Sequence, residues 1–323
     1  MIENFNATKN SSNENFENTD KHLGVASINI LRVNPKNADL RFYGWKIADD
    51  ADEPKYVTTN NEGKPSARVR FLVELEDTDE AVKPVVPMDF WIRPEVRLSN
   101  DGTKCQIIDA YGRTAWATKA DMKEKSIPLN SAGQPVKIDK NYKPAHYGEA
   151  ELIAFLMKYL NVTPLQKFSE KQNAWVDTEN PGRLTIDNWG ELCKGNVKEI
   201  EDYVKLQEDN RVKVIFGIRT TDDNKSYQTF FSGDIKSGAF ISNGARPNKI
   251  SGEYDSARKV LDRDRSYYAL NNKNYPYIYS AAPVKIWKQN ATEVKDNANA
   301  EDMPDLENND FSTNMVDDLP FRD

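Results

Sequence analysis

The sequence predicts an α+β protein, mainly β, in which a body of strands carries a helical insertion. Residues 67–75 alternate between apolar and polar side chains, which is the period-two pattern of a half-buried strand. The period changes to that of amphipathic helices at residues 149–160 and 188–206, and alternation returns at residues 211–218. Strands, then helices, then strands again favour an inserted helical segment over a regular βαβ series.

Shorter apolar runs predict the remaining strands, at residues 25–33, 88–92, 105–109, 227–231 and 284–287. Between the second and third of these runs, residues 99–103 contain an Asp-Gly pair, which is typical of a tight hairpin turn. We therefore expect a hairpin between those two runs.

The two helical segments each carry an apolar stripe. Leu156 belongs to the first stripe and Trp189 to the second, and we expect both stripes to lie in the core because amphipathic stripes normally do. Asn188 is followed three residues later by Glu191, a spacing that resembles a capping box at the start of the second helix.

The two ends of the chain differ from its middle in composition and charge. Residues 1–22 are rich in Asn, Ser and Glu and residues 290–323 in Asn, Asp and Glu, so we expect both segments to be disordered. The body is then residues 23–289, with the helical insertion at about 148–207. The tail has ten acids against Lys295 and Arg322, a net charge of −8, and residues 1–20 carry −3, which leaves +4 on the rest. A basic body with an acidic tail suggests a body that binds polyanions and a tail that regulates or recruits.

The sequence also contains information about the compartment in which the protein is located. The sequence has no run of about 18 apolar residues, so we expect no membrane span. Its first twenty residues lack a basic start followed by an apolar segment, so we expect no signal peptide. The two cysteines, Cys105 and Cys193, are interpreted as reduced thiols of a cytoplasmic protein, in the host cytoplasm if the protein is viral.

Motifs that would indicate catalysis are missing from the sequence. The two histidines, His22 and His146, have no Cys or His neighbour at metal-binding spacing, and His22 falls in the segment expected to be disordered. No phosphate-binding loop or nucleophile motif occurs. We therefore expect no enzymatic activity, no cofactor and no metal. The alternative is a metal-dependent nucleic-acid enzyme in which Asp109, Asp262 and Asp264 hold the ion.

Aromatic and basic side chains are interleaved at several places. Single-stranded nucleic acid requires this mixture, because cations hold its phosphates and flat rings stack on its exposed bases. Tyr111, Arg113, Trp116 and Lys119 form one such cluster. The candidate nucleic-acid-binding residues come from the others: Arg41, Tyr43, Trp45, Lys46, Trp91, Arg93, Arg97, Arg258, Lys259, Arg263, Arg265, Tyr267, Tyr268, Tyr275, Tyr277 and Tyr279. For each ring the alternative role is packing in the core of a β-body.

The tail ends in Asp317-Asp318-Leu319-Pro320-Phe321, followed by Arg322 and Asp323. This run resembles the acidic C-terminal tip of bacterial and bacteriophage single-stranded DNA-binding proteins, although the family tip usually ends on the phenylalanine. The resemblance implies an OB-fold-like β-barrel, a disordered acidic C-terminal tail, and a tip that recruits proteins of DNA replication, recombination and repair. Phe321 and Pro320 would then fill an apolar pocket on a partner, with Leu319 beside them, and Asp317 and Asp318 would meet basic residues.

In architecture and tail, the chain resembles the longer replication proteins of tailed bacteriophages. The sequence does not say whether the body contains one OB unit or two. Together these features predict a non-catalytic protein that binds and protects single-stranded DNA. A second alternative is a replisome adaptor that carries a tip-like motif on a body that does not bind DNA.

Overall fold

The structure is a computed structural model, and every element it describes lies in Met1–Trp287, one of two units into which the chain divides. The second unit, Lys288–Asp323, lies outside the described residues. The structure describes residues 21–59, 63–76, 82–169, 171–172, 174–207, 212–220, 226–230, 232–233, 235, 240–242 and 285–287.

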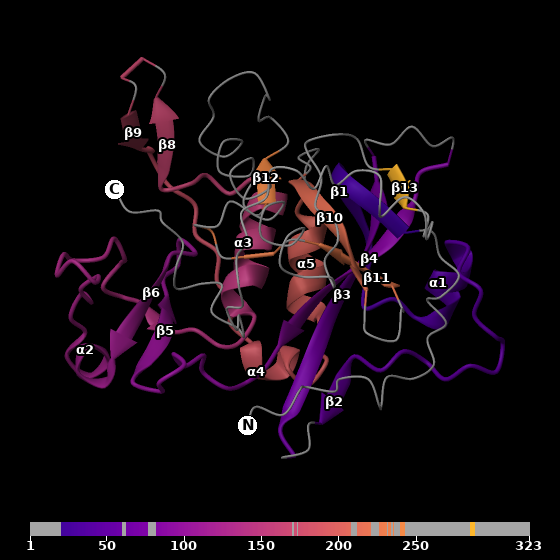
Figure 1. The fold of residues 1–323 in the computed structure, drawn as a ribbon, viewed down its shortest axis with the longest axis horizontal. Coiled ribbons are helices and arrows are strands. Elements are labelled where there is room, and N and C mark those ends of the chain that lie inside the picture. Colours follow the sequence, from indigo (N-terminus) through magenta and orange to yellow (C-terminus); the bar gives the residue numbers. More distant parts are fainter. Residues whose placement is uncertain are drawn as a thin grey trace, which may run out of the picture. The chain divides into compact units, whose positions relative to one another are not determined.

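Most described strands belong to one antiparallel sheet, so the α+β class is confirmed (Figure 1). Its strands are β1 (Lys21–Val33), β2 (Val57–Thr59), β3 (Pro65–Leu75), β4 (Val85–Ile92), β10 (Val212–Thr220), β11 (Ser226–Phe230), β12 (Phe240–Ser242) and β13 (Lys285–Trp287). The main path runs β11-β10-β1-β3-β2, with β4 on β3, β12 on β10 and β13 on β1. Among the described strands this path does not close into a barrel.

Strand β1 joins the two halves of the sheet. Its later residues pair with β3, starting with Ile28 opposite Leu75, and its middle residues pair with β10. Its first residues pair with β13, where His22 is opposite Ile286 and is buried. The expectation that residues 21 and 22 belong to a disordered segment is therefore wrong, because long-range pairing that no local pattern signals extends the strand to Lys21.

The main core lies between the sheet and helix α3 (Glu149–Tyr159). Val69, Phe71 and Val73 of β3 are buried on the face toward α3, as predicted. Arg70 and Leu72 on the other face are buried too, so the strand is not half-buried at these positions. Phe155 of α3 lies 5.1 Å from the rings of both Phe71 and Phe90. Each such ring contributes roughly 1.5–3 kcal/mol by burial, so this aromatic cluster is a principal source of stability. Phe90 also lies 5.1 Å from Phe230, which brings the edge strands β4 and β11 together.

Helix α3 begins at a point of close backbone approach. Its N-cap, Gly148, has a φ of +81°, and a Cβ at this position would collide with the backbone carbonyl oxygen of Trp91. Glycine is required here both by the left-handed conformation and by the space, so the start of α3 lies directly against β4.

A smaller sheet lies beside α3 and consists of β5 (Lys104–Ile108), β6 (Thr114–Thr118) and β7 (Lys143–Pro144), with helix α2 (Lys119–Glu124) after β6 (Figure 1). It has a core of its own, which includes Ile107, Ala117 and Tyr142. The predicted Asp-Gly turn forms, but it joins Leu98 to Cys105 by an isolated bridge. The expected hairpin between residues 88–92 and 105–109 is wrong, because β4 pairs with β3 along its whole length while β5 pairs with β6.

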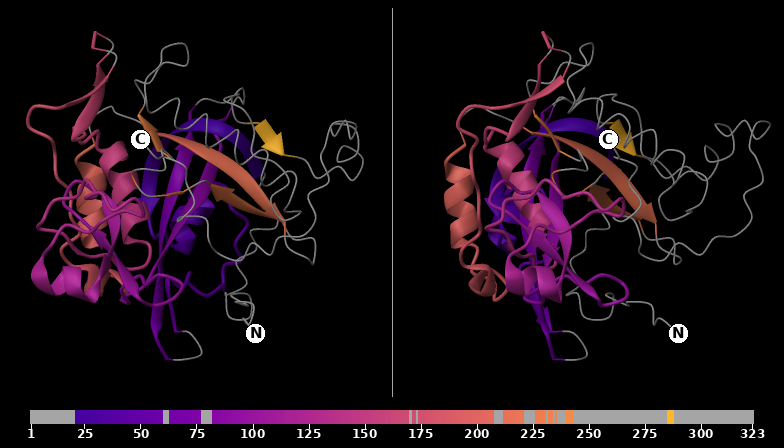
Figure 2. Two further views of the ribbon diagram at one scale, coloured as in Figure 1. Left: turned by 60° about the vertical axis from the view of Figure 1, so that its left-hand side comes forward. Right: turned by 90° about the vertical axis from the view of Figure 1, so that its left-hand side faces the viewer.

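The second predicted helix is two short helices, α4 (Trp189–Leu192) and α5 (Lys198–Lys205), preceded by a hairpin of β8 (Gln166–Ser169) and β9 (Ala174–Asp177) (Figure 2). Gly195, with a φ of +95°, interrupts the helical path between them. Asn188 makes no side-chain cap; the Glu199 carboxylate instead accepts hydrogen bonds from the backbone N–H groups of Asp187 and Asn188. The core role predicted for Leu156 and Trp189 is confirmed.

Within the described part of the chain, no helix has the length and apolar character needed to cross a bilayer.

Candidate nucleic-acid interface

The face of β3 and β4 turned away from α3, here called the outer face, carries the charged side chains of both strands. Alternation sends Arg68 and Arg70 of β3 outward, opposite to the buried Val69 and Phe71. The register of the two strands places Arg68 opposite Trp91 and Arg70 opposite Asp89. Cross-strand neighbours on one face lie within side-chain contact distance, so these four residues form one surface.

Arg70 and Asp89 form a two-pronged ion pair at the centre of the outer face. The Arg70 Nε and Nη2 atoms lie 2.7 and 2.8 Å from the two Asp89 carboxylate oxygens, and Arg70 is only 3% exposed. Arg68 Nη1 lies 3.5 Å from the same carboxylate. Burial acts to raise the pKa of Asp89, but the Arg70 guanidinium outweighs it and, with Arg68, holds that pKa below its usual value. Arg68 and Arg70 thus both contact the Asp89 carboxylate at the centre of the outer face.

Arg68 also contacts two aromatic rings. Its guanidinium carbon lies 5.3 Å from the ring centroid of Tyr56 and 5.7 Å from that of Trp91, both within the range of cation–π attraction. Trp91, near the end of the edge strand β4, is 53% exposed, which is high for a tryptophan. Its indole therefore offers water a flat apolar surface whose position Arg68 helps to fix.

Helix α1 (Asn37–Phe42) and the loop after it cover the other end of the outer face. Leu40 and Trp45 pack on Leu72 of β3, with Tyr43 partly buried against them. Trp45 is only 7% exposed, so the structure contradicts a base-stacking role for this ring. The aromatic cluster that suggested it is a small satellite core that seats α1 on the sheet. Lys46, the neighbour of Trp45, is exposed.

Three predicted arginines make specific local contacts. Arg41 donates hydrogen bonds to the backbone carbonyls of Ile47 and Ala48, which hold the loop after α1. Arg97 forms an ion pair with Glu151 of α3 at 2.9 Å. The guanidinium of Arg93 lies over the ring of Tyr147 at 5.5 Å, one step beyond the end of β4. Arg41 and Arg97 thus have defined structural roles, whereas Arg93 extends the basic surface next to Trp91.

The other predicted residues lie outside the described residues: Arg258, Lys259, Arg263, Arg265, Tyr267, Tyr268, Tyr275, Tyr277 and Tyr279, and the tip residues Asp317, Asp318, Leu319, Pro320 and Phe321. Two residues of the outer-face surface, Arg68 and Tyr56, were not among the candidates. The outward position of Arg68 in the alternating run 67–75 was the available signal; its pairing with Trp91 was not visible in the sequence.

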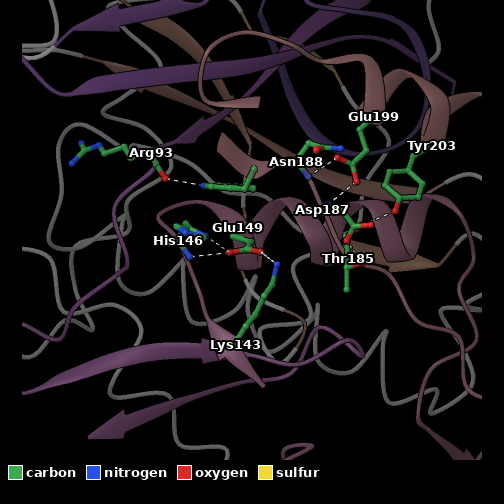
Figure 3. Close-up of polar contacts among 10 residues, drawn as sticks. Arg93, Lys143, His146, Glu149, Thr185, Asp187, Asn188, Glu199 and Tyr203 are labelled. Atoms are coloured by element: carbon green, nitrogen blue, oxygen red, sulfur yellow. Dashed lines mark hydrogen bonds and ion pairs between the residues drawn. The ribbon is translucent and has the colours of Figure 1, made fainter. Parts of the chain in front are cut away.

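A buried polar cluster links the end of β4 to α3 (Figure 3). Glu149, in the first turn of α3, is fully buried and lies 2.7 Å from Lys143 Nζ, and it also accepts a hydrogen bond from the backbone N–H of His146. Burial acts to raise the pKa of Glu149, but its contacts with His146 and Lys143 keep that pKa below its usual value. The indole of Trp189 stacks on His146 and donates to the backbone carbonyl of Arg93. These contacts fix the backbone just beyond Trp91.

Groups that could suggest catalysis have structural roles in the described part of the chain. The Asp109 carboxylate accepts hydrogen bonds from the backbone N–H groups of Tyr111, Arg113 and Asp139 and from the Arg113 guanidinium. Burial, with nearby carboxylates, raises the pKa of Cys193 to about 12, so its thiol stays protonated at neutral pH. Neither cysteine is in a disulfide. Among the described residues no three His, Cys, Asp or Glu side chains are grouped to hold a metal ion; Asp262 and Asp264 lie outside that part.

Comparison of the chain with models of protein families, with curated protein sequences and with solved structures found no significant match.

Proposed function

We propose that this protein binds single-stranded DNA, without catalysis, on the outer face of β3 and β4. The observation that carries the proposal is the half-exposed indole of Trp91, held beside the guanidinium of Arg68 on the outer face. A stacked base contributes about 1–3 kcal/mol, and stacking tolerates any base because every base has a flat face. A duplex hides those faces, so an exposed ring of this kind favours a single strand.

The charges around Trp91 support the same ligand. Arg68 and Arg70 both contact the carboxylate of Asp89, and Arg93 is a further cation just beyond the end of β4. The phosphates of an extended strand would then meet positive charge on both sides of the stacking ring. The net charge of +4 in residues 21–289, against −8 in the tail, fits a body that attracts a polyanion.

The strand order supports an OB-type barrel as the fold that presents this surface. In the described strands β1 pairs with both β3 and β10, β3 pairs with β4, and β10 pairs with β11. The Phe90–Phe230 contact brings β4 toward β11, and α3 follows β4 in the chain. We infer that β3 and β4 are the second and third barrel strands, the face on which OB folds bind oligonucleotides. The connection that carries Arg41, Tyr43 and Lys46 is then the first barrel loop.

We expect Trp91→Ala to weaken binding of oligo-dT by a factor of about 5 to 150, the equivalent of one lost stacking contact. The measurement is a titration of the full chain followed by fluorescence anisotropy of a labelled oligomer. Trp91→Phe keeps a ring and should retain most of the affinity. Circular dichroism should show both variants folded, since Trp91 lies outside the core. Equal affinity of the alanine variant and the unchanged chain, or of the unchanged chain for oligo-dT and duplex, would overturn the proposal.

We also propose that residues 317–321 recruit proteins of DNA replication, recombination and repair. The ring of Phe321 would supply buried area, and the carboxylates of Asp317 and Asp318 would steer the tip toward a basic pocket. Phe321→Ala should lose capture of such proteins from a bacterial lysate while its affinity for oligo-dT stays unchanged. Capture that persists in this variant would remove the tip from the proposal.

A further inference from the structure

The turn between β5 and β6 holds a second group of aromatic and basic residues, apart from the outer face. The guanidinium carbons of Arg113 and Arg183 lie 5.4 and 5.0 Å from the ring centroid of Tyr111. Arg183 also donates hydrogen bonds from Nε and Nη2 to the Tyr111 hydroxyl, at 3.2 and 2.9 Å. Two cations from distant parts of the sequence thus meet on one ring.

The two arginines differ in how their charge is balanced. Arg113 lies 2.7 Å from the buried carboxylate of Asp109, so its charge is paired. Arg183 is exposed, and among the described residues it makes no ion pair with a carboxylate. Its contacts with the Tyr111 hydroxyl fix the direction of the guanidinium, and the carboxylate of Asp139 attracts its charge without forming a direct ion pair. A planar guanidinium held in this way has already lost part of the side-chain entropy that binding would cost.

Further cations stand close to this turn. The backbone N–H of Asp139 donates to Asp109 at 3.0 Å, which holds the segment around Asp139 against the turn. The neighbours Lys137 and Lys140 are both exposed. The one acid of this segment, Asp139, is outnumbered by Lys137, Lys140 and Arg183. In residue type this segment and Arg183 together supply three cations and one acid, and Arg183 has the fork geometry that matches phosphate.

We propose that Arg183, oriented by Tyr111 and assisted by Lys137 and Lys140, binds a phosphodiester group of the same single-stranded DNA that stacks on Trp91. This inference rests on the proposed function. A phosphate is favoured over a base because the Tyr111 ring is already in contact with two guanidiniums, so the groups left to a ligand are cations. The chain connects the two surfaces in steps: β4 ends at Ile92, the Arg97 carbonyl accepts from the backbone N–H of Gln106 in β5, and β5 leads to the turn that holds Tyr111.

The test measures the affinity of oligo-dT of increasing length for the full-length Arg183→Gln variant and for the unchanged protein. Lys194→Gln is the matched control, because Lys194 is also exposed and its loss removes the same charge. The shortest oligomers that bind at Trp91 should have equal affinity for all three proteins. Longer oligomers should lose about tenfold in affinity for Arg183→Gln alone, and the slope of log affinity against log salt should fall by about 0.7. Tyr111→Phe, which keeps the ring but not the hydroxyl, should show part of the same loss.

The outcomes separate the two proposals. If the unchanged chain binds these oligomers and Arg183→Gln matches it in affinity and salt slope at every length, the phosphate site is wrong and the Trp91 surface stands. If Lys194→Gln loses as much as Arg183→Gln, the effect is one of net charge and the site is again wrong. An unchanged chain that binds no oligomer overturns both proposals.

Discussion

Replacement of Asp89 by asparagine is expected to lower the free energy of unfolding by about 3–5 kcal/mol. Asp89 is the carboxylate that pairs with Arg70, and Arg70 is only 3% exposed. Asparagine keeps the shape of the side chain but removes its charge, so the buried Arg70 guanidinium would lose the carboxylate that pairs with its Nε and Nη2 atoms. Unfolding by urea, followed by far-ultraviolet circular dichroism, measures the change.

Asp202→Asn is the control for this prediction. Asp202 also pairs with two cations, Lys198 and Lys205, but all three side chains are more than half exposed. Exposed pairs contribute about 0–1 kcal/mol, so this variant should unfold close to the unchanged chain. Similar stability of Asp89→Asn and Asp202→Asn would show that the Arg70 pair is not a buried one.

The same Asp89–Arg70 pair makes the free energy of unfolding depend on pH in the acid range. The folded pKa of Asp89 lies below its ordinary value of 3.8, so the unfolded chain binds the proton first as pH falls. The stabilisation is therefore complete above that ordinary value and is lost as pH falls through the lower, folded pKa. Asp89→Asn should lack this part of the loss of stability at acid pH, as measured by urea unfolding at several pH values.

Glu149→Gln is expected to have an effect of similar size, about 3–5 kcal/mol, because Glu149 is the fully buried partner of Lys143 and His146. The substitution leaves the Lys143 ammonium beside a neutral amide at the start of α3. Thermal and urea unfolding should both report the loss. The folded pKa of Glu149 lies below its ordinary value of 4.5, so its contribution is present above pH 4.5 and declines as pH falls through the folded value.

Glu191→Gln is the matched control for Glu149→Gln. Glu191 also pairs with a lysine, Lys194, at 2.7 Å, but both side chains are more than half exposed. Its replacement should change stability by less than about 1 kcal/mol. Equal unfolding curves for the two glutamine variants would contradict the role assigned to the buried cluster at the start of α3.

Local patterns predicted the elements whose signal is contained in a single segment. Alternation along residues 67–75 predicted β3 and the face that it turns toward the core, and the stripe through Leu156 predicted α3. Both signals are local, because the side chains that face the core recur at the fixed period of a strand or a helix. The second helix was predicted too long, since the stripe from Trp189 to Val204 runs across Gly195 without a break in its apolar positions. The hairpin predicted around Asp101-Gly102 failed because the turn signal does not specify which strands it joins.

The candidate site could be predicted only in part, because composition does not distinguish a buried ring from an exposed one. Trp45 and Trp91 both lie among arginines and aromatic residues, yet Trp45 packs under α1 and Trp91 faces solvent. The difference depends on Leu72, which lies on the outer face where α1 can cover it. Arg68 belongs to the site through its cross-strand partner, and Arg183 meets Tyr111 across 72 positions of the sequence. Such contacts depend on tertiary packing, which a local period does not report.

If Trp91 stacks on a base as proposed, the close approach of Gly148 to the carbonyl of Trp91 makes a residue without a side chain a determinant of that binding. A methyl group at position 148 would displace either the first turn of α3 or the peptide that carries the Trp91 indole. In either case the ring would tilt relative to Arg68, although position 148 has no side chain to touch a nucleotide. The orientation of the Trp91 ring thus depends on the opposite side of β4, where only a residue with a hydrogen atom in place of Cβ fits.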